Sequence, residues 1–349
     1  MIRATTRATT RATTRATTLT SCCLLTVLVL TLASCERKPG GSGATKTIAV
    51  IPKGTTHEFW KSIHAGANKA GTEFNLEIVW KGPLKEDDRE DQIKVVEDFV
   101  TRGVSGIVLA PLDDTALRKP VEDAVKAGIP VVIIDSDLKS DAYVSFAATD
   151  NFKGGESAGE ELARLLDKKG KVIMLRYAPG SASTTNREEG FLKAIKKYPG
   201  IEIVSDNQFA GATTEAAYQA SENLLAPLKK PDGSLSIDGI FTPNESSCFG
   251  MLRALQDGKF AGKVKFVGFD SSSKLVEALG NGQIDALVVQ DPMNMGYKGV
   301  ELMAKHLRGE PVDKRVDTGS TLVTKANMND PKIKELLNPP FEQYLSGEK

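Results

Sequence analysis

The sequence predicts an α/β protein with two Rossmann-like lobes, each built on a parallel sheet, joined by a hinge of three segments. Its 349 residues exceed the size of one ordinary domain and suit two α/β lobes. Short runs rich in β-branched residues alternate with stretches of helical periodicity. This alternation begins near residue 46 and begins again after Asp150, which indicates two successive sets of strand–helix units.

The first 34 residues have the order of a secretory signal peptide. Arg-Ala-Thr-Thr occurs four times over residues 3–18, and an apolar run at 24–32, too short to remain as a membrane span, precedes small residues. Translation from Met1 and a start further along the chain both fit this pattern.

Residues 32–35, Leu-Ala-Ser-Cys, resemble the bacterial lipobox, whose cysteine thiol receives a diacylglycerol before cleavage. We therefore expect lipid on Cys35, a polar tether over residues 35–45, and a body in the periplasm or cell envelope that is lipid-anchored to a membrane. The alternative is an incidental cysteine beside a conventional cleavage site.

The first lobe is expected over residues 46–148 together with 291–319. Its strands are the apolar runs at 47–51, 76–80, 106–110 and 131–134. Apolar residues recur at helical spacing after the first two runs, at positions 59, 63, 67, 70 and 74 and at 93, 96 and 100. Continuous apolar strands separated by helices are typical of a parallel sheet covered on both faces.

The second lobe is expected over residues 149–290 together with 320–330. Its strands are the runs at 171–175, 201–205, 239–242, 264–267 and 286–289. The chain is expected to cross between the lobes near 147–150, 290–292 and 319–322, and these crossings form the hinge. Residues 331–349 form a tail for which the sequence favours neither an ordered strap nor disorder.

Seven short motifs follow one another along residues 46–325. They are 48–53 with 58–60, 128–131 leading to Asp135, 150–151 with 154–155, 187–191, Asn244, 267–270 and 290–292. In this order they resemble the sugar-binding proteins of ABC transporters, of the ribose- and galactose-binding type. This family has the type I periplasmic binding protein fold, which effector domains of lac-repressor-type regulators share. The resemblance implies a monomer that closes around a monosaccharide and delivers it to a transporter permease.

The resemblance also implies the contacts of the first lobe. A sugar presents apolar C–H faces and hydroxyls that donate and accept, so its pocket needs flat aromatic surfaces and planar polar groups. Phe59 and Trp60 are expected to pack over the sugar face, although the spacing of Phe59 also fits the buried stripe of a helix. Asp135, at a strand end, is expected to accept two hydroxyl hydrogen bonds, or else simply to start a turn.

Four residues of the second lobe complete the expected site. Arg187, early in a helix, is expected to hold adjacent hydroxyls or the ring oxygen, the alternative being an exposed helix charge. Asn244 and Asp270 each follow a strand and precede a helix, so ligand contact and helix N-capping both suit them. Gln290, at a lobe crossing, is expected to form hydrogen bonds with the sugar and with the hinge.

Some positions depart from the ribose-type pattern. Lys53 stands in place of a small hydroxyl residue, His57 and Glu58 in place of Asn-Pro, and Ala210 in place of an aromatic residue. Residues 51–53 and 135–137 are closer to the branch that binds rhamnose or furanosyl signalling molecules. We add Lys53 and His57 to the expected ligand-binding residues, facing an acidic group on the sugar, with surface solvation as the alternative. The ligand stays open among ribose, galactose, rhamnose and related sugars, charged or deoxy sugars included.

Other function classes lack their motifs. No Gly-x-Gly-x-x-Gly, Gly-x-Ser-x-Gly or His-Glu-x-x-His occurs, and the histidines at 57, 64 and 306 are scattered. Cys248, the lone cysteine of the body, is expected to be a small buried hydrophobe. We therefore expect no catalytic residue, metal or cofactor.

The charge composition bears on the partners. Lysine plus arginine and aspartate plus glutamate both number 45, which disfavours nucleic acid. A sugar-responsive repressor would need a helix-turn-helix where this chain has a signal and tether. A sensory lipoprotein that presents its sugar to a membrane receptor or sensor kinase remains the alternative function, because its pocket would be identical.

Overall fold

The computed structural model describes residues 45–346. The predicted signal peptide, Cys35 and nearly all of the tether lie outside these residues. Within the described range, no helix combines the length and the apolar composition that crossing a bilayer requires.

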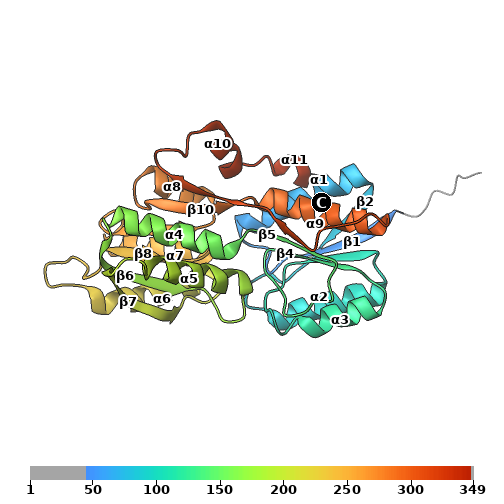
Figure 1. The fold of residues 1–349 in the computed structure, drawn as a ribbon, viewed down its shortest axis with the longest axis horizontal. Coiled ribbons are helices and arrows are strands. Elements are labelled where there is room, and N and C mark those ends of the chain that lie inside the picture. Colours follow the sequence, from blue (N-terminus) through green and yellow to red (C-terminus); the bar gives the residue numbers. More distant parts are fainter. Residues whose placement is uncertain (1–44, 347–349) are drawn as a thin grey trace, which may run out of the picture. The chain divides into compact units, whose positions relative to one another are not determined.

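The N-terminal lobe, at the right in Figure 1, is built on a parallel sheet. The strand order of this sheet is β11-β5-β4-β3-β1-β2. Its strands are β1 (Lys46–Ile51), β2 (Leu76–Trp80), β3 (Gly106–Leu109), β4 (Val131–Ile134), β5 (Ser145–Ala148) and β11 (Arg315–Asp317). Helices α1 (Glu58–Phe74) and α9 (Pro292–Leu307) cover one face, and α2 (Arg89–Arg102) and α3 (Arg118–Lys126) cover the other. Neighbouring residues of β1 point to opposite faces, since Ile48 packs with α1 and Ala49 with α2, so the predicted double-sided burial is confirmed.

The C-terminal lobe has the sheet order β12-β10-β9-β8-β6-β7. Its strands are β6 (Lys169–Arg176), β7 (Gly200–Phe209), β8 (Gly239–Phe241), β9 (Lys265–Phe269), β10 (Ala286–Gln290) and β12 (Ser320–Thr324). Helices α4 (Asn151–Leu165) and α5 (Ala182–Ile195) cover one face. The other face carries α6 (Thr214–Leu225), α7 (Glu245–Asp257) and α8 (Ser273–Gly280), with a short 3₁₀ turn η1 (Ala226–Leu228) after α6.

The three-segment hinge is confirmed within the described residues. The chain passes between the sheets from β5 to α4, from β10 to α9, and from β11 to β12. The first and third segments touch, because Thr149 Oγ1 donates to the Gly319 carbonyl at 2.9 Å. β12 pairs antiparallel with β10 and is an exception to the expected parallel sheets. It enters the sheet from the hinge beside the end of β10, with Ser320 opposite Gln290, and therefore runs in the opposite direction to β10.

Helices α4 and α5 approach each other closely through two glycines. A Cβ on Gly155 would lie 2.0 Å from the Arg187 carbonyl oxygen, and one on Gly190 would lie 2.1 Å from that of Phe152. Any side chain at these positions would push the helices apart. Gly155, the second glycine of the Gly154–Gly155 motif, therefore allows the packing that places Arg187.

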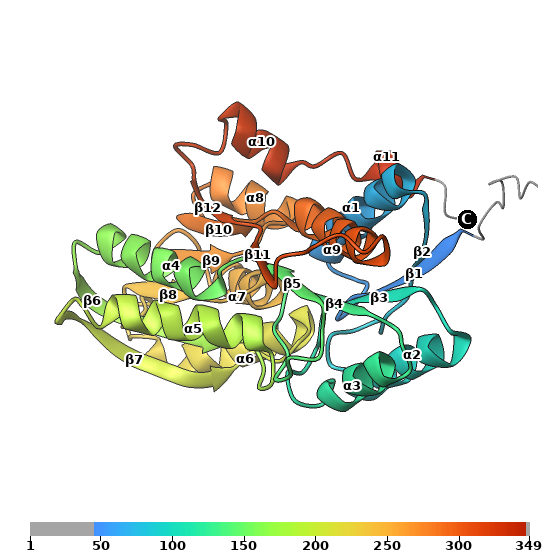
Figure 2. The same ribbon diagram turned by 45° about the vertical axis from the view of Figure 1, so that its right-hand side comes forward.

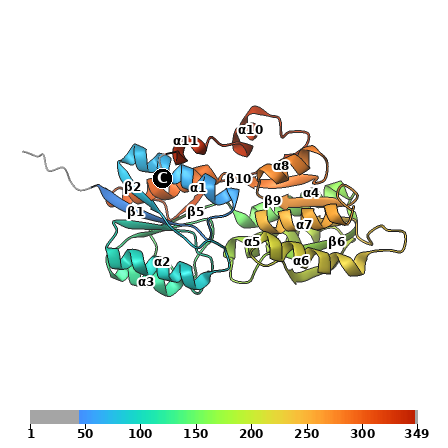
Figure 3. The same cartoon turned by 180° about the vertical axis from the view of Figure 1, so that it is seen from behind.

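Residues 325–346 form a segment that we call the C-terminal strap. It contains α10 (Pro331–Leu337), near α8, and α11 (Glu342–Leu345), beside α1 (Figures 2 and 3). Met328, Ile333, Leu336 and Leu337 pack against the apolar core of the C-terminal lobe. At its other end, the Tyr344 carbonyl accepts a hydrogen bond of 3.0 Å from Asn68 of α1. The strap thus contacts both lobes.

Candidate functional site

A small cavity of about 20 Å³ lies between the carboxyl ends of the two sheets. All nine residues expected from the sequence to bind ligand line it: Lys53, His57, Phe59, Trp60, Asp135, Arg187, Asn244, Asp270 and Gln290. Five further lining residues were not predicted: Glu86, Tyr177, Ser183, Thr184 and Glu245. The structure therefore brings the predicted set together at the place where open parallel sheets bind ligands.

Arg187 is held rigidly and keeps one nitrogen for another partner. Its Nε donates to Asn151 Oδ1 at 2.7 Å, its Nη1 donates to the Pro243 carbonyl at 2.9 Å, and its guanidinium lies 4.0 Å from the ring centre of Phe269. The side chain is 2% exposed, so the alternative of an exposed helix charge is wrong. Nη2 has no hydrogen-bond partner among the described residues.

Gln290 and Asp270 form a second fixed group. Gln290 is 1% exposed and donates from Nε2 to Asp270 Oδ1 at 2.6 Å, while its Oε1 has no partner within residues 45–346. Asp270 Oδ2 accepts from the backbone N–H of Glu245 at 3.0 Å. Burial raises the pKa of Asp270, although the Arg187 charge and these hydrogen bonds act to lower it.

The helix-capping alternative holds for one of the two candidate residues. Asn244 is the N-cap of α7, and its side chain accepts from the backbone N–H of Ser247 at 3.2 Å. Asp270 is not an N-cap, since Ser272 has that position before α8. Asn244 thus combines a cap with a place in the cavity wall.

Lys53 lies inside the structure rather than on its surface. It is 4% exposed, and its Nζ lies 2.8 Å from Asp135 Oδ2. The same ammonium donates to Ser183 Oγ at 3.1 Å in the other lobe. The alternative of a solvated lysine is wrong, and the ammonium charge is paired with a carboxylate. Asp135 also has φ +62°, a strained value that turns the chain at the end of β4.

His57 is mostly buried, with 13% of its side chain exposed, and is also paired, so surface solvation is wrong for it too. Its Nδ1 lies 2.7 Å from Glu86 Oε1. Burial acts to lower the pKa of His57, but the charge of Glu86 and the hydrogen bond to it, with Glu245 and Asp270, outweigh burial and raise the pKa to about 9. The imidazole is therefore a cation near neutral pH.

The two aromatic residues belong to a helix stripe and to the cavity wall, while their contact with a sugar stays a prediction. Phe59 and Trp60 pack in the apolar cluster beneath α1 and also line the cavity. Their rings meet edge to face, with centres 5.0 Å apart. A helix stripe and a cavity wall are thus the same surface at this point of the chain.

The lining is rich in charge but nearly balanced. The cations are Lys53, His57 and Arg187, and the carboxylates are Glu86, Asp135, Asp270 and Glu245. Within the described part of the chain, no group of three His, Cys, Asp or Glu side chains is arranged to hold a metal ion. The site thus combines fixed donors and acceptors with a small excess of carboxylates over cations.

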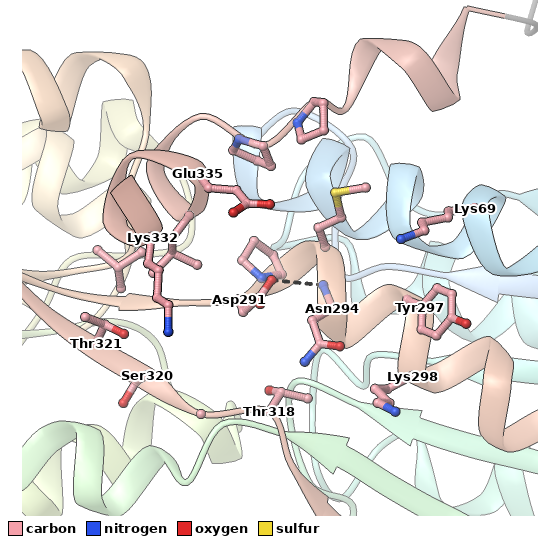
Figure 4. A pocket seen from close by; sticks show the side chains of 17 residues that line it. Lys69, Asp291, Asn294, Tyr297, Lys298, Thr318, Ser320, Thr321, Lys332 and Glu335 are labelled. Carbon is pink, nitrogen blue, oxygen red and sulfur yellow. Dashed lines mark hydrogen bonds between the residues drawn. The ribbon is translucent and has the colours of Figure 1, made fainter. Parts of the chain in front are cut away.

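A larger cavity of about 640 Å³ lies between the hinge, α9 and the strap (Figure 4). None of the nine predicted residues lines it. Several of its polar groups are already paired: Lys298 contacts Glu301 at 2.7 Å, and Asp291 accepts from the Asn294 N–H at 3.0 Å. The larger cavity is lined by one buried atom without a hydrogen-bond partner among the described residues, Thr318 Oγ1, whereas the smaller cavity is lined by two, Arg187 Nη2 and Gln290 Oε1. Size alone therefore does not mark the ligand site, and the paired donor and acceptor favour the smaller cavity.

Cys248 of α7 is buried against Thr242 and Phe269, as expected for a small hydrophobe. Burial raises the pKa of its thiol to about 12. The thiol is thus protonated and unreactive at physiological pH.

Two α/β lobes with aromatic and polar groups converging between their strand ends define a solute-binding protein. Residues 48–311 match the model of the periplasmic binding protein domain. Over 307 residues the chain is 30% identical to the ribose import binding protein RbsB of Escherichia coli K12, across 86% of this chain and 98% of that protein. It is 28% identical over 307 residues to the D-ribose/D-allose-binding protein of Pseudomonas aeruginosa PAO1, across 86% of this chain and 92% of that protein.

Solved structures agree. A carbohydrate transporter solute-binding protein from Agrobacterium radiobacter, in complex with D-arabinose, is 38% identical with a TM-score of 0.80, over 85% of this chain and 100% of that one. A solute-binding protein from Agrobacterium vitis with bound D-fucose is 36% identical with a TM-score of 0.79, over 84% of this chain and 100% of that one. The chain belongs to the periplasmic binding protein family, among the sugar-binding proteins of ABC transporters, and is not an enzyme.

Proposed function

We propose that this protein is an exported lipoprotein, anchored through Cys35, that captures a neutral monosaccharide between its lobes and delivers it to an ABC permease. The named ligands of its relatives, among them ribose, allose, arabinose and fucose, indicate a pentose or hexose.

Two buried atoms carry this proposal. Arg187 Nη2 is a donor and Gln290 Oε1 is an acceptor, and neither has a hydrogen-bond partner among the described residues, although Nη2 lies 4.0 Å from Asp135 Oδ1. Both residues line the small cavity between the strand ends. An unsatisfied buried polar atom costs roughly 1–3 kcal/mol, so a ligand hydroxyl that bonds each atom recovers that free energy. A sugar hydroxyl both donates and accepts, and adjacent hydroxyls can serve both atoms.

Capture requires the lobes to separate. A cavity of about 20 Å³ holds about one water molecule, which is far less than a sugar ring. Contacts such as Lys53 to Ser183 join the lobes directly and must break for entry. A sugar that bridges both lobes then shifts the population toward a closed form, in proportion to its extra affinity for that form.

The ion pairs favour a neutral ligand over an acidic one. Lys53 is paired with Asp135, and His57 is paired with Glu86. An acidic sugar would have to displace a carboxylate from a buried cation and leave that carboxylate unpaired. This pairing removes the reason for expecting an acidic group opposite Lys53 and His57.

A calorimetric titration tests the proposal. The panel contains D-ribose, D-arabinose, D-allose, D-fucose, D-galactose and L-rhamnose, with D-galacturonate and mannitol as controls. We expect at least one neutral aldose to bind in the micromolar range or tighter and to raise the melting temperature, while galacturonate does neither. Binding of galacturonate alone, or of none of the panel, would refute it.

The anchor and the partner need separate experiments. Mass spectrometry of the protein from native membranes should show diacylglycerol on Cys35, and Cys35→Ala should release the protein into the soluble fraction. Loss of sugar uptake on deletion of the gene supports transport. Retained uptake with loss of a sugar-induced transcriptional response would favour the alternative, a sensory lipoprotein.

A further inference from the structure

We propose that Glu86 positions Trp60 and His57 in the wall of the sugar site, and that its hydrogen bond from Tyr177 forms only when the lobes close. The inference rests on the proposed function, because it assumes that a sugar occupies the cavity between the lobes.

Glu86 is held in place by its own segment, which joins β2 to α2. The backbone N–H of Thr55 donates to the Leu84 carbonyl at 3.4 Å, and Asp88 caps α2. Glu86 is 7% exposed, and a Cβ on Gly54 would lie only 2.9 Å from its Cγ. The carboxylate therefore has little freedom to turn away from the cavity.

Two of its hydrogen-bond partners belong to the same lobe. Trp60 Nε1 donates to Glu86 Oε1 at 2.6 Å, and His57 Nδ1 lies 2.7 Å from the same oxygen. Both side chains line the cavity. A buried indole N–H requires an acceptor, so Glu86 fixes the orientation of the ring that faces the ligand.

The third partner comes from the other lobe. Tyr177 follows β6 in the C-terminal lobe, and its hydroxyl donates to Glu86 Oε2 at 2.6 Å. The backbone N–H of Tyr177 donates to Glu188 within its own lobe. Of the two hydrogen bonds that Tyr177 donates, separation of the lobes therefore breaks only the one from its hydroxyl. Glu86 thus has one donor that depends on closure and two that do not.

The charges around this group keep Glu86 ionised. Burial acts to raise the pKa of Glu86, but His57, Lys53 and the Tyr177 hydroxyl outweigh it and lower the pKa to about 2. His57 also faces Glu245 and Asp270, and Tyr177 also faces Asp135 and Asp87. The bond from Tyr177 is therefore charge-assisted over the whole physiological range.

Tyr177→Phe tests the closure bond, with the best sugar from the panel above and stopped-flow fluorescence. We expect sugar dissociation about tenfold faster than in the wild type, with association changed less than twofold, since the bond exists only after closure. Tyr218→Phe is the matched control, because Tyr218 donates to Glu222 and Asp257 within the C-terminal lobe and away from the cavity. It should leave both rates unchanged.

Glu86→Gln tests the positioning role. We expect affinity to fall tenfold or more while circular dichroism remains native. The NMR titration of His57 should also shift from about 9 toward its ordinary value of 6.5, which a merely structural residue would not cause. Glu86→Asp retains the charge and should keep the pKa of His57 raised.

The outcomes separate the two proposals. If the wild type binds no sugar, the proposed function and this inference both fall. If the wild type binds sugar while Tyr177→Phe dissociates at the wild-type rate, or Glu86→Gln leaves the His57 titration in place, only the role of Glu86 is overturned.

Discussion

Glu58 of the N-terminal lobe accepts two hydrogen bonds from Ser273 of the C-terminal lobe, one from its backbone N–H at 2.9 Å and one from its hydroxyl at 2.6 Å. A second glutamate makes the reverse contact. Glu245 of the C-terminal lobe accepts from the backbone N–H groups of Glu58 and Phe59, at 3.3 and 3.2 Å. Each carboxylate thus lies at the N-terminus of a helix in the opposite lobe, where N–H groups are free and negative charge is favourable.

Glu58→Ala should weaken the closed form without unfolding either lobe. The two bonds to Ser273 are partly exposed, so we expect their loss to cost roughly 1 kcal/mol, or about fivefold in affinity, mostly as faster sugar dissociation. Glu73→Ala, in the same helix but bonded to Tyr297, is the control and should leave the rates unchanged. Equal dissociation rates for the two variants would count against this role.

Sugar release should become faster as pH rises from 5 to 8. Burial raises the pKa of Glu245 to about 7, against the opposing effects of His57 and the Phe59 and Glu58 N–H groups. Because separation of the lobes exposes Glu245 to water and returns its pKa toward the ordinary 4.5, its contribution to the closed form is fully present below about pH 4.5 and is lost as pH rises through about 7. Dissociation rates measured across this range should follow that titration.

Glu245→Gln should abolish this pH dependence. Glu188→Gln is the control, since burial also raises the pKa of Glu188 to about 7 but its hydrogen-bond partners, Arg176 and the Tyr177 N–H, lie in its own lobe. It should alter the pH dependence of the melting temperature and not that of release. A Glu245→Gln variant whose release still accelerates with pH would show that another group is responsible.

Arg187→Lys should nearly abolish binding. A lysine cannot bond Asn151 and Pro243 while also presenting a third donor to the ligand, because it lacks the planar fork. We expect a loss of about 3 kcal/mol, or about 100-fold in affinity, by calorimetry. Arg176→Lys, in the same lobe and outside the cavity, should bind almost normally. Near-normal affinity of the Arg187 variant would exclude the assigned role.

Removal of residues 339–349 should speed both entry and release of the sugar. This deletion keeps α10 on the C-terminal lobe and removes α11, which holds the strap to α1. Pro339 and Phe341 also line a small cavity with Phe59, Asp270 and Gln290, so the strap covers one side of the site. Stopped-flow rates several-fold above wild type are expected, and deletion of residues 347–349 alone should change neither rate. If the longer deletion also changed neither rate, the strap would not restrain the lobes.

Much of the fold could be predicted because its strands are apolar on both faces. Strands β1 to β4 lie where continuous apolar runs stand in the sequence. Strands β5 and β11 could not be found this way, since Ser-Phe-Ala-Ala at 145–148 and Arg-Val-Asp at 315–317 lack such a run. They form because neighbouring strands supply the hydrogen bonds: β5 pairs with the preceding strand β4 and with β11, which is distant in sequence.

The candidate site likewise contains residues that could be predicted from the sequence and residues that could not. Strand ends and the family motifs selected nine residues that share one cavity. Glu86 gave no such signal, because it lies in a polar segment without periodicity, and Tyr177, the partner that makes it notable, is 91 residues away. For Glu245 the sequence held a weak signal, because this residue directly follows Asn244 at the start of a helix after a strand. Contacts between lobes depend on how two folded units meet, which local sequence does not encode.

A crystal structure of the protein with the sugar that binds most tightly in the panel shows which side chains the ligand contacts. We expect density for the sugar between the sheet ends, with one hydroxyl within 3.2 Å of Arg187 Nη2 and another within that distance of Gln290 Oε1. Density for the sugar in the larger cavity beneath the strap, with Arg187 Nη2 and Gln290 Oε1 still unpartnered by ligand, would contradict it.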